Sequence, residues 1–319
     1  MKSRIAVSFF AAAFSIALPL FNMPPEKALP PQGSLWYEFP EPGSFADAEL
    51  FITLLDGDAT LTISMEDYLY GAVAAEMPAS FDKEALKAQA VALRTYAMYK
   101  LNVSPSANHS EDLCSSSSCC AAWKTDEYLR EKWGDDYTVY SRIIRSAVSS
   151  TDGEYLVYGG EPALAVFHAS SSGQTESSAA VWGKSLPYLI SVDTPESAET
   201  VRGFEEELYF TKNELLSLLD GADGNKPLIA DEVRTESGRL ASISICGVSL
   251  SGRELRSLLG LGSTAVELSE ENGGLRITTR GRGHGVGMSQ FGADLMAKEG
   301  ADYREILSAY YPGTELAGK

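Results

Sequence analysis

The sequence predicts an α+β fold in which helices and antiparallel strands are mixed and form two lobes with a substrate cleft. Three observations predict this class. The segment Tyr68–Lys100 has the apolar spacing of two helices. Turn signals at Asp56-Gly57 and Glu236-Ser237-Gly238, each between β-rich runs, predict hairpins. The 319 residues, 44% of them hydrophobic, suffice for one large or two modest cores.

The segment Tyr68–Lys100 is interpreted as two helices with a break at residues 77–80. Pro78 cannot continue a hydrogen-bonded helix and disfavours the helical conformation in the residue before it. Glu76 is therefore expected at the end of the first helix, which begins at a capping signal, Ser64. The apolar stripe of the second helix consists of Leu86, Ala90, Leu93 and Ala97.

Two cations, Lys87 and Arg94, lie two turns apart on the neighbouring stripe of the second helix, where they alternate with the apolar residues Val91 and Met98. Buried or half-buried cations are costly unless an anion pairs with them, so we predict Glu76 as their partner. A carboxylate held in this way is a positioned acid whose pKa its neighbours control. The alternative is that Glu76 only caps a helix while both cations extend to water.

The formal net charge of -18 excludes sequence-independent binding to nucleic acids or anionic lipid surfaces, because phosphates repel such a chain. A polysaccharide substrate makes no comparable demand.

Residues 1–22 are predicted to form a membrane signal anchor. Ile5–Phe21 is almost continuously apolar and follows the cations Lys2 and Arg4. Because no convincing small-residue cleavage site precedes the polar flank, we expect a retained anchor with its basic end in the cytoplasm. Residues 23–50 are proline-rich and predict an extended extracytoplasmic linker.

The remaining residues, 51–319, are predicted to form the functional domain. Residues 200–270 contain fewer chemical motifs and are a possible inserted subdomain within it.

The segment Asn108–Trp123 contains three of the four cysteines. His109, Cys114 and Cys120 provide the donor types of a zinc site within one short loop, where chelation costs little closure entropy. A disulfide from Cys114 to Cys119 or Cys120 is equally compatible with the spacing, because the segment is expected outside the cytoplasm.

The segment 168–192 crowds hydroxyl and amide side chains between a predicted strand and a tryptophan. Such groups hydrogen-bond to sugar hydroxyls and acetamides, and aromatic rings stack on pyranose faces. A serine hydrolase triad is disfavoured, because the sequence has no G-x-S-x-G motif. The predicted substrate-binding residues of this segment are His168, Ser170, Gln174, Thr175 and Trp182.

Residues 281–290 have glycine at every second position up to residue 287. We interpret this pattern as a strand with one bare face that backbone or sugar can approach, while Arg282 and His284 point the other way. The spacing is unlike that of a phosphate-binding loop, which also needs a lysine. Ser289 is predicted to cap the following helix. His284, Ser289 and Gln290 complete the predicted substrate-binding set.

Several of these motifs together resemble the stage II sporulation protein D family of bacterial cell-wall lytic transglycosylases, which is related to amidase enhancers. The first segments that carry the resemblance are Glu76-Met77-Pro78, Ala85–Ala90 and Arg94-Thr95-Tyr96. Further similar segments are Phe167–Glu176, Val181-Trp182-Gly183, Pro187-Tyr188-Leu189 and Gly283–Gln290. The resemblance runs from about Phe51 to Leu316.

The resemblance implies cleavage of the peptidoglycan glycan backbone with formation of 1,6-anhydro-N-acetylmuramic acid, during engulfment in endospore formation. It implies that Glu76 is the catalytic acid, that Lys87 and Arg94 are functionally required, and that Tyr188 is the active-site tyrosine. A non-catalytic wall-binding activator of an amidase and a zinc hydrolase of stem peptides are the alternatives.

The resemblance also implies zinc held by His109, Cys114 and Cys120, more in keeping with a structural than a catalytic role. Cys119 departs from the family pattern, in which a histidine is common at that position, so either neighbouring thiol could be the ligand. The implied partners are a peptidoglycan amidase and an integral membrane scaffold at the sporulation septum, with the domain extracytoplasmic and anchored by a single span.

Overall fold

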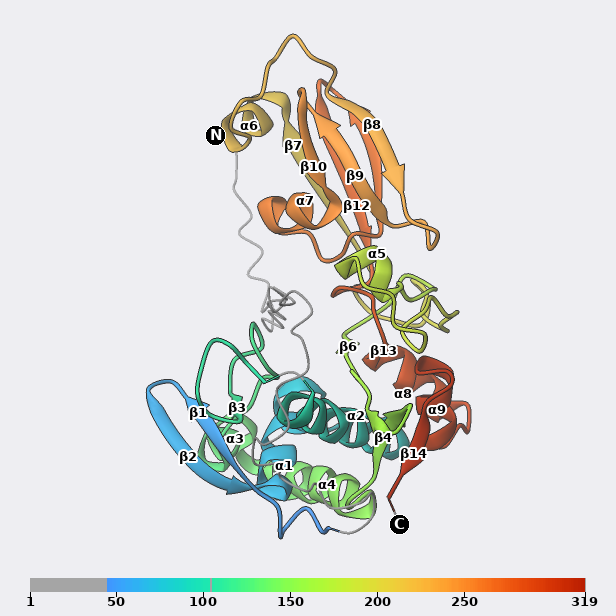
Figure 1. Ribbon diagram of the computed structural model, residues 1–319. Helices are drawn as coiled ribbons and strands as arrows, with labels where there is room; N and C mark the ends of the chain where they lie inside the picture. Colours follow the sequence, from blue (N-terminus) through green and yellow to red (C-terminus); the bar gives the residue numbers. More distant parts are fainter. Residues whose placement is uncertain (1–44, 104, 319) are drawn as a thin grey trace.

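The computed structural model describes residues 45–103 and 105–318 (Figure 1). The predicted anchor at 1–22 and most of the predicted linker at 23–50 lie outside the described residues. Within the described ranges, no helix is both long enough and apolar enough to span a membrane.

The described residues form a mixture of helices and mostly antiparallel strands, which confirms the predicted α+β class. The helices are α1 (Met65–Glu76), α2 (Lys83–Asn102), α3 (Asp126–Trp133), the 3-10 helix η1 (Gly134–Asp136), α4 (Tyr137–Ser150), α5 (Ser178–Trp182), α6 (Lys212–Leu218), α7 (Gly252–Leu259), α8 (Gln290–Lys298) and α9 (Tyr303–Tyr310). The strands are β1 (Phe51–Asp56), β2 (Ala59–Ser64), β3 (Leu113–Cys114), β4 (Tyr155–Tyr158), β5 (Glu161–Pro162), β6 (Phe167–His168), β7 (Glu205–Thr211), β8 (Ile229–Arg234), β9 (Leu240–Ile245), β10 (Val248–Ser251), β11 (Val266–Glu271), β12 (Gly274–Arg280), β13 (Met288–Ser289) and β14 (Glu315–Ala317).

The strands form small sheets with the orders β2-β1-β3, β14-β4-β5, β13-β6, β11-β12-β7 and β10-β9-β8. Only the pairs β1–β3 and β6–β13 are parallel among the described strands. The hairpin predicted at Asp56-Gly57 is the β1–β2 pair, and the one predicted around Glu236-Ser237-Gly238 is β8–β9. Both predictions are therefore confirmed.

Two hydrophobic cores organise these elements. The first core contains the apolar faces of α1, α2, α4, α8 and α9, and the second lies among β7 to β12 with α6 and α7. Figure 1 shows the helical part and the β-rich part at opposite ends of the molecule, with α5, β6 and β13 between them. The substrate cleft remains a prediction.

The helix pair that the sequence predicts is present, with its break. The Ser64 hydroxyl accepts a hydrogen bond from the Asp67 N–H and so caps α1. Met77 is extended, and Asp82 caps the start of α2 in the same way. The predicted apolar stripe is fully buried at Leu86, Ala90, Leu93 and Ala97.

The strand predicted across the glycine-rich segment is wrong. The backbone φ lies between 69° and 112°, outside the range of strands, at Gly281, Gly283, Gly285 and Gly287. A Cβ at Gly287 would lie 2.0 Å from the backbone oxygen of Val166. The glycines therefore allow an irregular segment to pack tightly against the chain near β6, and Arg282 is exposed whereas His284 is buried.

Candidate functional site

Glu76 lies at the last position of α1 with its side chain in the interior, only 4% exposed. Its Oε1 accepts a hydrogen bond of 2.8 Å from the backbone N–H of Ala122. Burial raises the pKa of Glu76 from 4.5 to about 7, although the Ala122 hydrogen bond opposes the rise. A carboxyl with this pKa can both donate and accept a proton near neutrality.

The predicted ion pairs between Glu76 and the cations of α2 are wrong. Lys87 Nζ lies 2.8 Å from Glu84 Oε1, one turn earlier on the same helix. Such an i,i+3 partner is available locally, without closing a loop between two helices. Arg94 pairs with Asp47 instead. The pKa of Glu76 is thus raised by burial and not controlled by a neighbouring cation.

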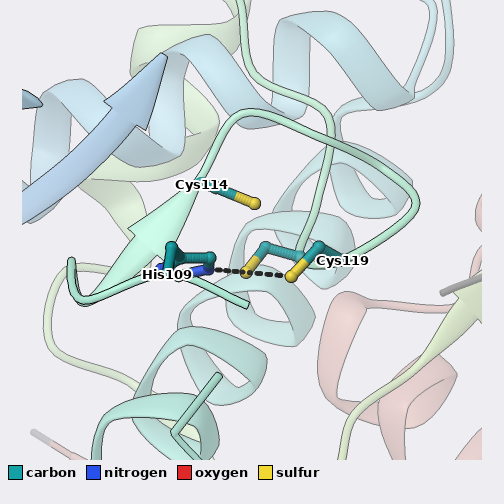
Figure 2. Close-up of side chains that lie close together, drawn as sticks. His109, Cys114 and Cys119 are labelled. Atoms are coloured by element: carbon teal, nitrogen blue, oxygen red, sulfur yellow. Dashed lines mark hydrogen bonds between the residues drawn. The ribbon is translucent and has the colours of Figure 1, made fainter. Parts of the chain in front are cut away.

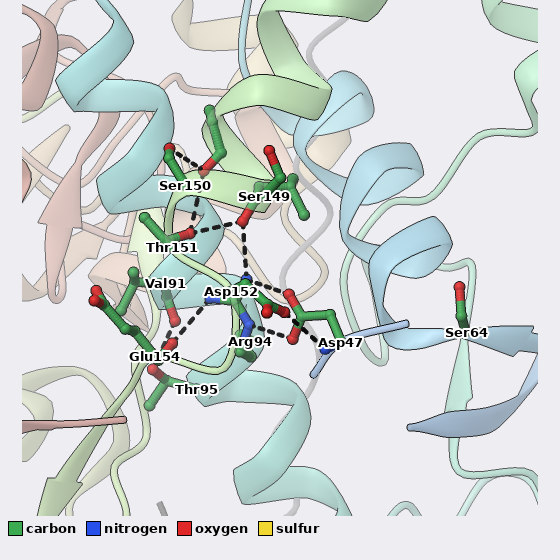
Figure 3. A network of polar contacts seen from close by, with 12 residues as sticks. Asp47, Ser64, Val91, Arg94, Thr95, Ser149, Ser150, Thr151, Asp152 and Glu154 are labelled. Atoms are coloured by element: carbon green, nitrogen blue, oxygen red, sulfur yellow. Dashed lines mark hydrogen bonds and ion pairs between the residues drawn. The ribbon is translucent and has the colours of Figure 1, made fainter. Parts of the chain in front are cut away.

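Arg94 is fully buried and has a carboxylate of its own (Figure 3). Its Nε and Nη2 donate to the two oxygens of Asp47 at 2.8 and 2.5 Å, and Nη1 donates to the Glu154 backbone oxygen at 2.9 Å. Two parallel bonds between a guanidinium and a carboxylate are a strong, directional arrangement. The Asp47 N–H also donates to Asp152, in the turn after α4. Arg94 therefore joins the start of the described chain to the α4–β4 turn.

Potential metal donors converge in one loop, and Figure 2 shows three of them, His109, Cys114 and Cys119, close together. One ligand atom from each of His109, Cys114, Cys119 and Cys120 lies within 4.8 Å of every other. The parallel β1–β3 pair holds Cys114 in place, and a hydrogen bond of 2.8 Å from the Cys120 N–H to the Ser116 oxygen turns the chain back towards it. The cluster could thus hold a metal ion.

The chemistry of these donors fits zinc. Three thiols and one imidazole form one of the usual tetrahedral donor sets of structural zinc sites. His109 Nδ1 lies 2.8 Å from the Glu111 backbone oxygen, so it can donate there while Nε2 faces Cys120 at 3.5 Å. Metal-binding histidines are commonly oriented by such a second hydrogen bond.

Cys119 is a fourth potential donor, predicted only as an alternative to Cys120. Both neighbours reach the cluster, and all three thiols of the loop are free. The hydrogen bond with Cys120 lowers the pKa of Cys114 to about 5 and raises that of Cys120. With four protein donors a tetrahedral shell is complete, so a bound metal would have no open position for water or substrate.

The loop with the metal donors is also the loop that holds Glu76. Ala122, whose N–H binds the Glu76 carboxyl, follows Cys120 by two residues. Anything that orders the four donors consequently orders this hydrogen bond as well.

The two histidines of the predicted substrate-binding set are internal. His168 Nε2 lies 2.7 Å from Ser171 Oγ and Nδ1 lies 3.2 Å from the Val286 oxygen, while His284 Nδ1 accepts from the Val286 N–H at 3.0 Å. Their ring centroids are 5.7 Å apart. Burial lowers the pKa of both, to about 3 for His284, so both rings are neutral at pH 7. They connect the glycine-rich segment to residues 168–182, which we term the serine-rich loop.

Ser289 and Gln290 are also buried. The Ser289 hydroxyl donates to the Glu196 carboxylate, which also accepts from the Ser171 N–H at 2.9 Å. Gln290 Nε2 donates to Gln89 Oε1 at 3.3 Å. Glu196 was not among the predicted residues, because it lies outside every motif and is recruited only through the fold.

The other predicted residues divide by accessibility. Ser170 and Thr175 are buried, whereas Gln174 and Trp182 keep accessible surface and can contact a ligand directly. Tyr188 is only 5% exposed, and its hydroxyl accepts from the Leu164 N–H at 2.9 Å. The substrate-binding and catalytic roles of these residues stay predictions.

The break after Glu76 and the glycine-rich segment meet through α8. The Asp82 N–H donates to Asp294 at 2.7 Å, and the rings of Phe81 and Phe291 pack with centroids 5.0 Å apart. Since α8 begins directly after the glycine-rich segment, these contacts connect the acid to the loops that carry the predicted sugar-binding residues.

Comparisons with known proteins agree with the motifs. The family profile described as "Stage II sporulation protein" matches residues 57–158. The chain is 38% identical to stage II sporulation protein D of Bacillus subtilis (strain 168), covering 80% of this chain and 75% of that protein. It is 36% identical to the protein of the same name from Bacillus amyloliquefaciens, covering 80% and 74%. An amidase enhancer of Bacillus subtilis (strain 168) is 30% identical, covering 78% of this chain and 40% of that protein.

The Arg94–Asp47 pair generates a stability prediction. The substitution Asp47→Ala leaves a buried guanidinium without its carboxylate, so we expect the free energy of unfolding to fall by about 3–5 kcal/mol in urea denaturation followed by circular dichroism. Arg130→Gln, which breaks an exposed pair with Asp126, is the control and should change it little. An Asp47→Ala protein with unchanged stability would contradict the structural role of Arg94.

Proposed function

Because the chain belongs to the stage II sporulation protein D family, we propose that it is a peptidoglycan lytic transglycosylase that acts in endospore formation. Family membership supports the role in sporulation. The observation that carries the enzymatic proposal is Glu76, a buried carboxyl at a helix break whose pKa is raised to about 7.

One carboxyl is enough for this reaction. Glycosidases generally need two carboxylates, one as acid and one as base or nucleophile. In a lytic transglycosylase the C6 hydroxyl of N-acetylmuramic acid is the nucleophile, and its tethered attack loses little entropy. Glu76 protonates the oxygen that leaves with N-acetylglucosamine, and its carboxylate then accepts the C6 proton as the 1,6-anhydro ring closes. A pKa near neutrality suits both steps.

The other residues act on orientation and on the fold. Gln174 and Trp182, which keep accessible surface, contact the sugar, and Tyr188 supports their loop from within. Arg94 is required through its pair with Asp47.

The four-donor cluster would hold zinc in a structural role. With the metal bound, His109, Cys114, Cys119 and Cys120 would be cross-linked, and the loop would keep the Ala122 N–H against Glu76. A complete donor set also argues against the stem-peptide hydrolase, which needs a metal-bound water.

The similarity to an amidase enhancer supports a role of this chain at the cell wall. We place the domain outside the cytoplasm at the engulfing membrane, anchored by residues 1–22, beside a peptidoglycan amidase and an integral membrane scaffold. The same likeness favours a second candidate function, that of a non-catalytic wall-binding activator of an amidase.

Mass spectrometry of digested peptidoglycan tests the enzymatic proposal. The wild-type chain should release fragments that end in 1,6-anhydro-N-acetylmuramic acid. Glu76→Gln should lower the rate at least about a hundredfold and leave glycan binding intact, because it removes the only proposed acid and base. Expressed in place of the wild-type chain, the same variant should arrest engulfment.

Glu66→Gln, at the opposite end of α1, is the matched control. Reducing N-acetylmuramic acid ends alone would identify a hydrolase. Wall binding without any cleavage by the wild-type chain would instead favour the amidase activator.

The raised pKa of Glu76 also predicts how stability depends on pH. The folded state holds the Glu76 proton more tightly than the unfolded state does. The protonated carboxyl therefore contributes fully to the free energy of unfolding below about pH 4.5, and this contribution is lost as the pH rises through about 7. From about pH 5 to about pH 8, the free energy of unfolding of the wild-type chain, measured by urea denaturation, should fall by about 2–3 kcal/mol relative to that of Glu76→Gln.

Other groups titrate in both proteins, so their effects cancel when the free energy of unfolding of Glu76→Gln is subtracted from that of the wild-type chain. Tyr68, on the same helix, interacts electrostatically with Glu76, but its pKa is raised well above 10 by burial and it stays neutral in this range. A pH-independent difference between the two proteins would show that Glu76 titrates normally.

Elemental analysis of protein purified without added metal should give about one zinc per chain. Cys114→Ser and Cys119→Ser should both lower the zinc content, and chelation should lower the melting temperature by loosening the loop. Cys246→Ser, a buried free cysteine of the second core, should leave zinc unchanged. Absence of zinc together with a disulfide from Cys114 to Cys119 or Cys120 in a thiol count would refute the metal site.

A further inference from the structure

Three arginines from the β-rich part of the molecule approach the serine-rich loop and the histidine pair. Arg239, which precedes β9, donates through Nη2 to the Gln174 backbone oxygen at 3.1 Å. Arg253, on α7, donates through Nη1 to the Val181 backbone oxygen at 3.1 Å. Arg256, one turn further along α7, interacts electrostatically with both of these arginines. The three cations thus gather where the two cores adjoin.

Unlike Arg94, these three arginines form no ion pair with the described residues. Among the ion pairs formed within residues 45–103 and 105–318, none involves Arg239, Arg253 or Arg256. Arg239 is only 1% exposed, and its Nε and Nη1 have no hydrogen-bond partner among the described residues. The carboxylates of Glu176 and Glu196 attract Arg239 electrostatically, but neither forms an ion pair with it, and both accept hydrogen bonds from hydroxyl groups.

The surroundings make this arrangement costly without a ligand. The pKa of Arg256 is lowered to about 10, by burial first and then by Arg239, Arg282 and Arg253. Partly desolvated like charges destabilise a site unless an anion offsets them. The chain has 44 acidic and 26 basic residues, so three arginines that form no ion pair with the described residues contrast with its overall charge.

The histidine pair and Trp182 complete the surroundings of the cluster. The His284 ring lies 5.4 Å from the Trp182 ring and feels the electrostatic effect of all three arginines. Both histidines are neutral and hydrogen-bonded, so they do not add to the positive charge of the arginines. Trp182 keeps accessible surface and offers an aromatic face for a sugar ring.

We propose that Arg253 and Arg256, which keep accessible surface, form a binding site for an oxyanion carried by a cell-wall polymer. The buried Arg239 adds positive charge beside them, and Trp182 is the platform for the adjoining sugar. Guanidinium groups bind carboxylates and phosphates through paired hydrogen bonds. The anion is the lactyl carboxylate of N-acetylmuramic acid or the phosphate of a phosphodiester-linked wall polymer. Only the identity of the polymer rests on the proposed function.

Ligand-observed NMR titration of the full chain tests the site with N-acetylmuramic acid, N-acetylglucosamine and inorganic phosphate. The two sugars differ by the lactyl group, and neither has a glycosidic bond to cleave, so the result is independent of transglycosylase activity. We expect an anion to bind in preference to N-acetylglucosamine, and Arg256→Gln to weaken its binding at least about tenfold. Preference for N-acetylmuramic acid identifies the carboxylate, and binding of phosphate alone identifies the phosphodiester.

Arg276→Gln is the matched control. It removes the same charge from the β-rich part of the molecule, but Arg276 is paired with Glu207 and Glu271. Arg253→Gln, a partly exposed site, serves as a second test if Arg256→Gln does not fold by circular dichroism. The proposal is overturned if neither anion binds better than N-acetylglucosamine, or if the folded variants bind anions as Arg276→Gln does.

Discussion

The burial of Glu76 at the end of α1 is the constraint on which the rest of the site depends. A carboxyl in the interior favours its neutral form unless hydrogen bonds or cations compensate. Here one backbone N–H compensates in part, and the pKa rests at about 7. The proline-containing break that follows α1 makes this possible, because it ends the helix inside the protein and not at the surface.

Two separate parts of the chain support that position. The loop of His109, Cys114, Cys119 and Cys120 supplies the hydrogen bond to Glu76. Helix α8, which directly follows the glycine-rich segment, packs against the break after α1. In the proposed reaction Glu76 must meet one glycosidic oxygen and therefore needs a rigid frame. Each support includes a hydrogen bond that a backbone N–H donates, and the backbone has less freedom than a side chain.

Buried cations are compensated in three different ways. Lys87 forms an ion pair with Glu84 on its own helix. Arg94 forms an ion pair with Asp47, which is distant in the sequence. Among the described residues, Arg239, Arg253 and Arg256 donate to backbone oxygens and form no ion pair, although Glu176 and Glu196 attract Arg239 electrostatically. The first two arrangements are internally balanced and explain local or global stability. In the proposed site the third arrangement is completed by an anion of the ligand, and this difference separates a binding site from a structural ion pair.

The sequence by itself determined the features that depend on local spacing. The break at Pro78, the cap at Ser64 and the hairpin at Asp56-Gly57 follow from the conformational limits of a few adjacent residues, and the structure has them all. The donors of the metal loop were also recognisable, because they lie close together in the chain.

Only the tertiary structure decided which distant groups meet. Asp47 reaches Arg94 across 47 residues, and Glu196 reaches Ser289 across 93, so neither pair has a local signal. The glycine-rich segment was misread as a strand because alternation of residue types does not report φ, whereas packing against β6 demands positive values. Side-chain chemistry can be read from the sequence, but the partner of a buried charge is chosen by the packing of whole elements, which no short stretch of residues encodes.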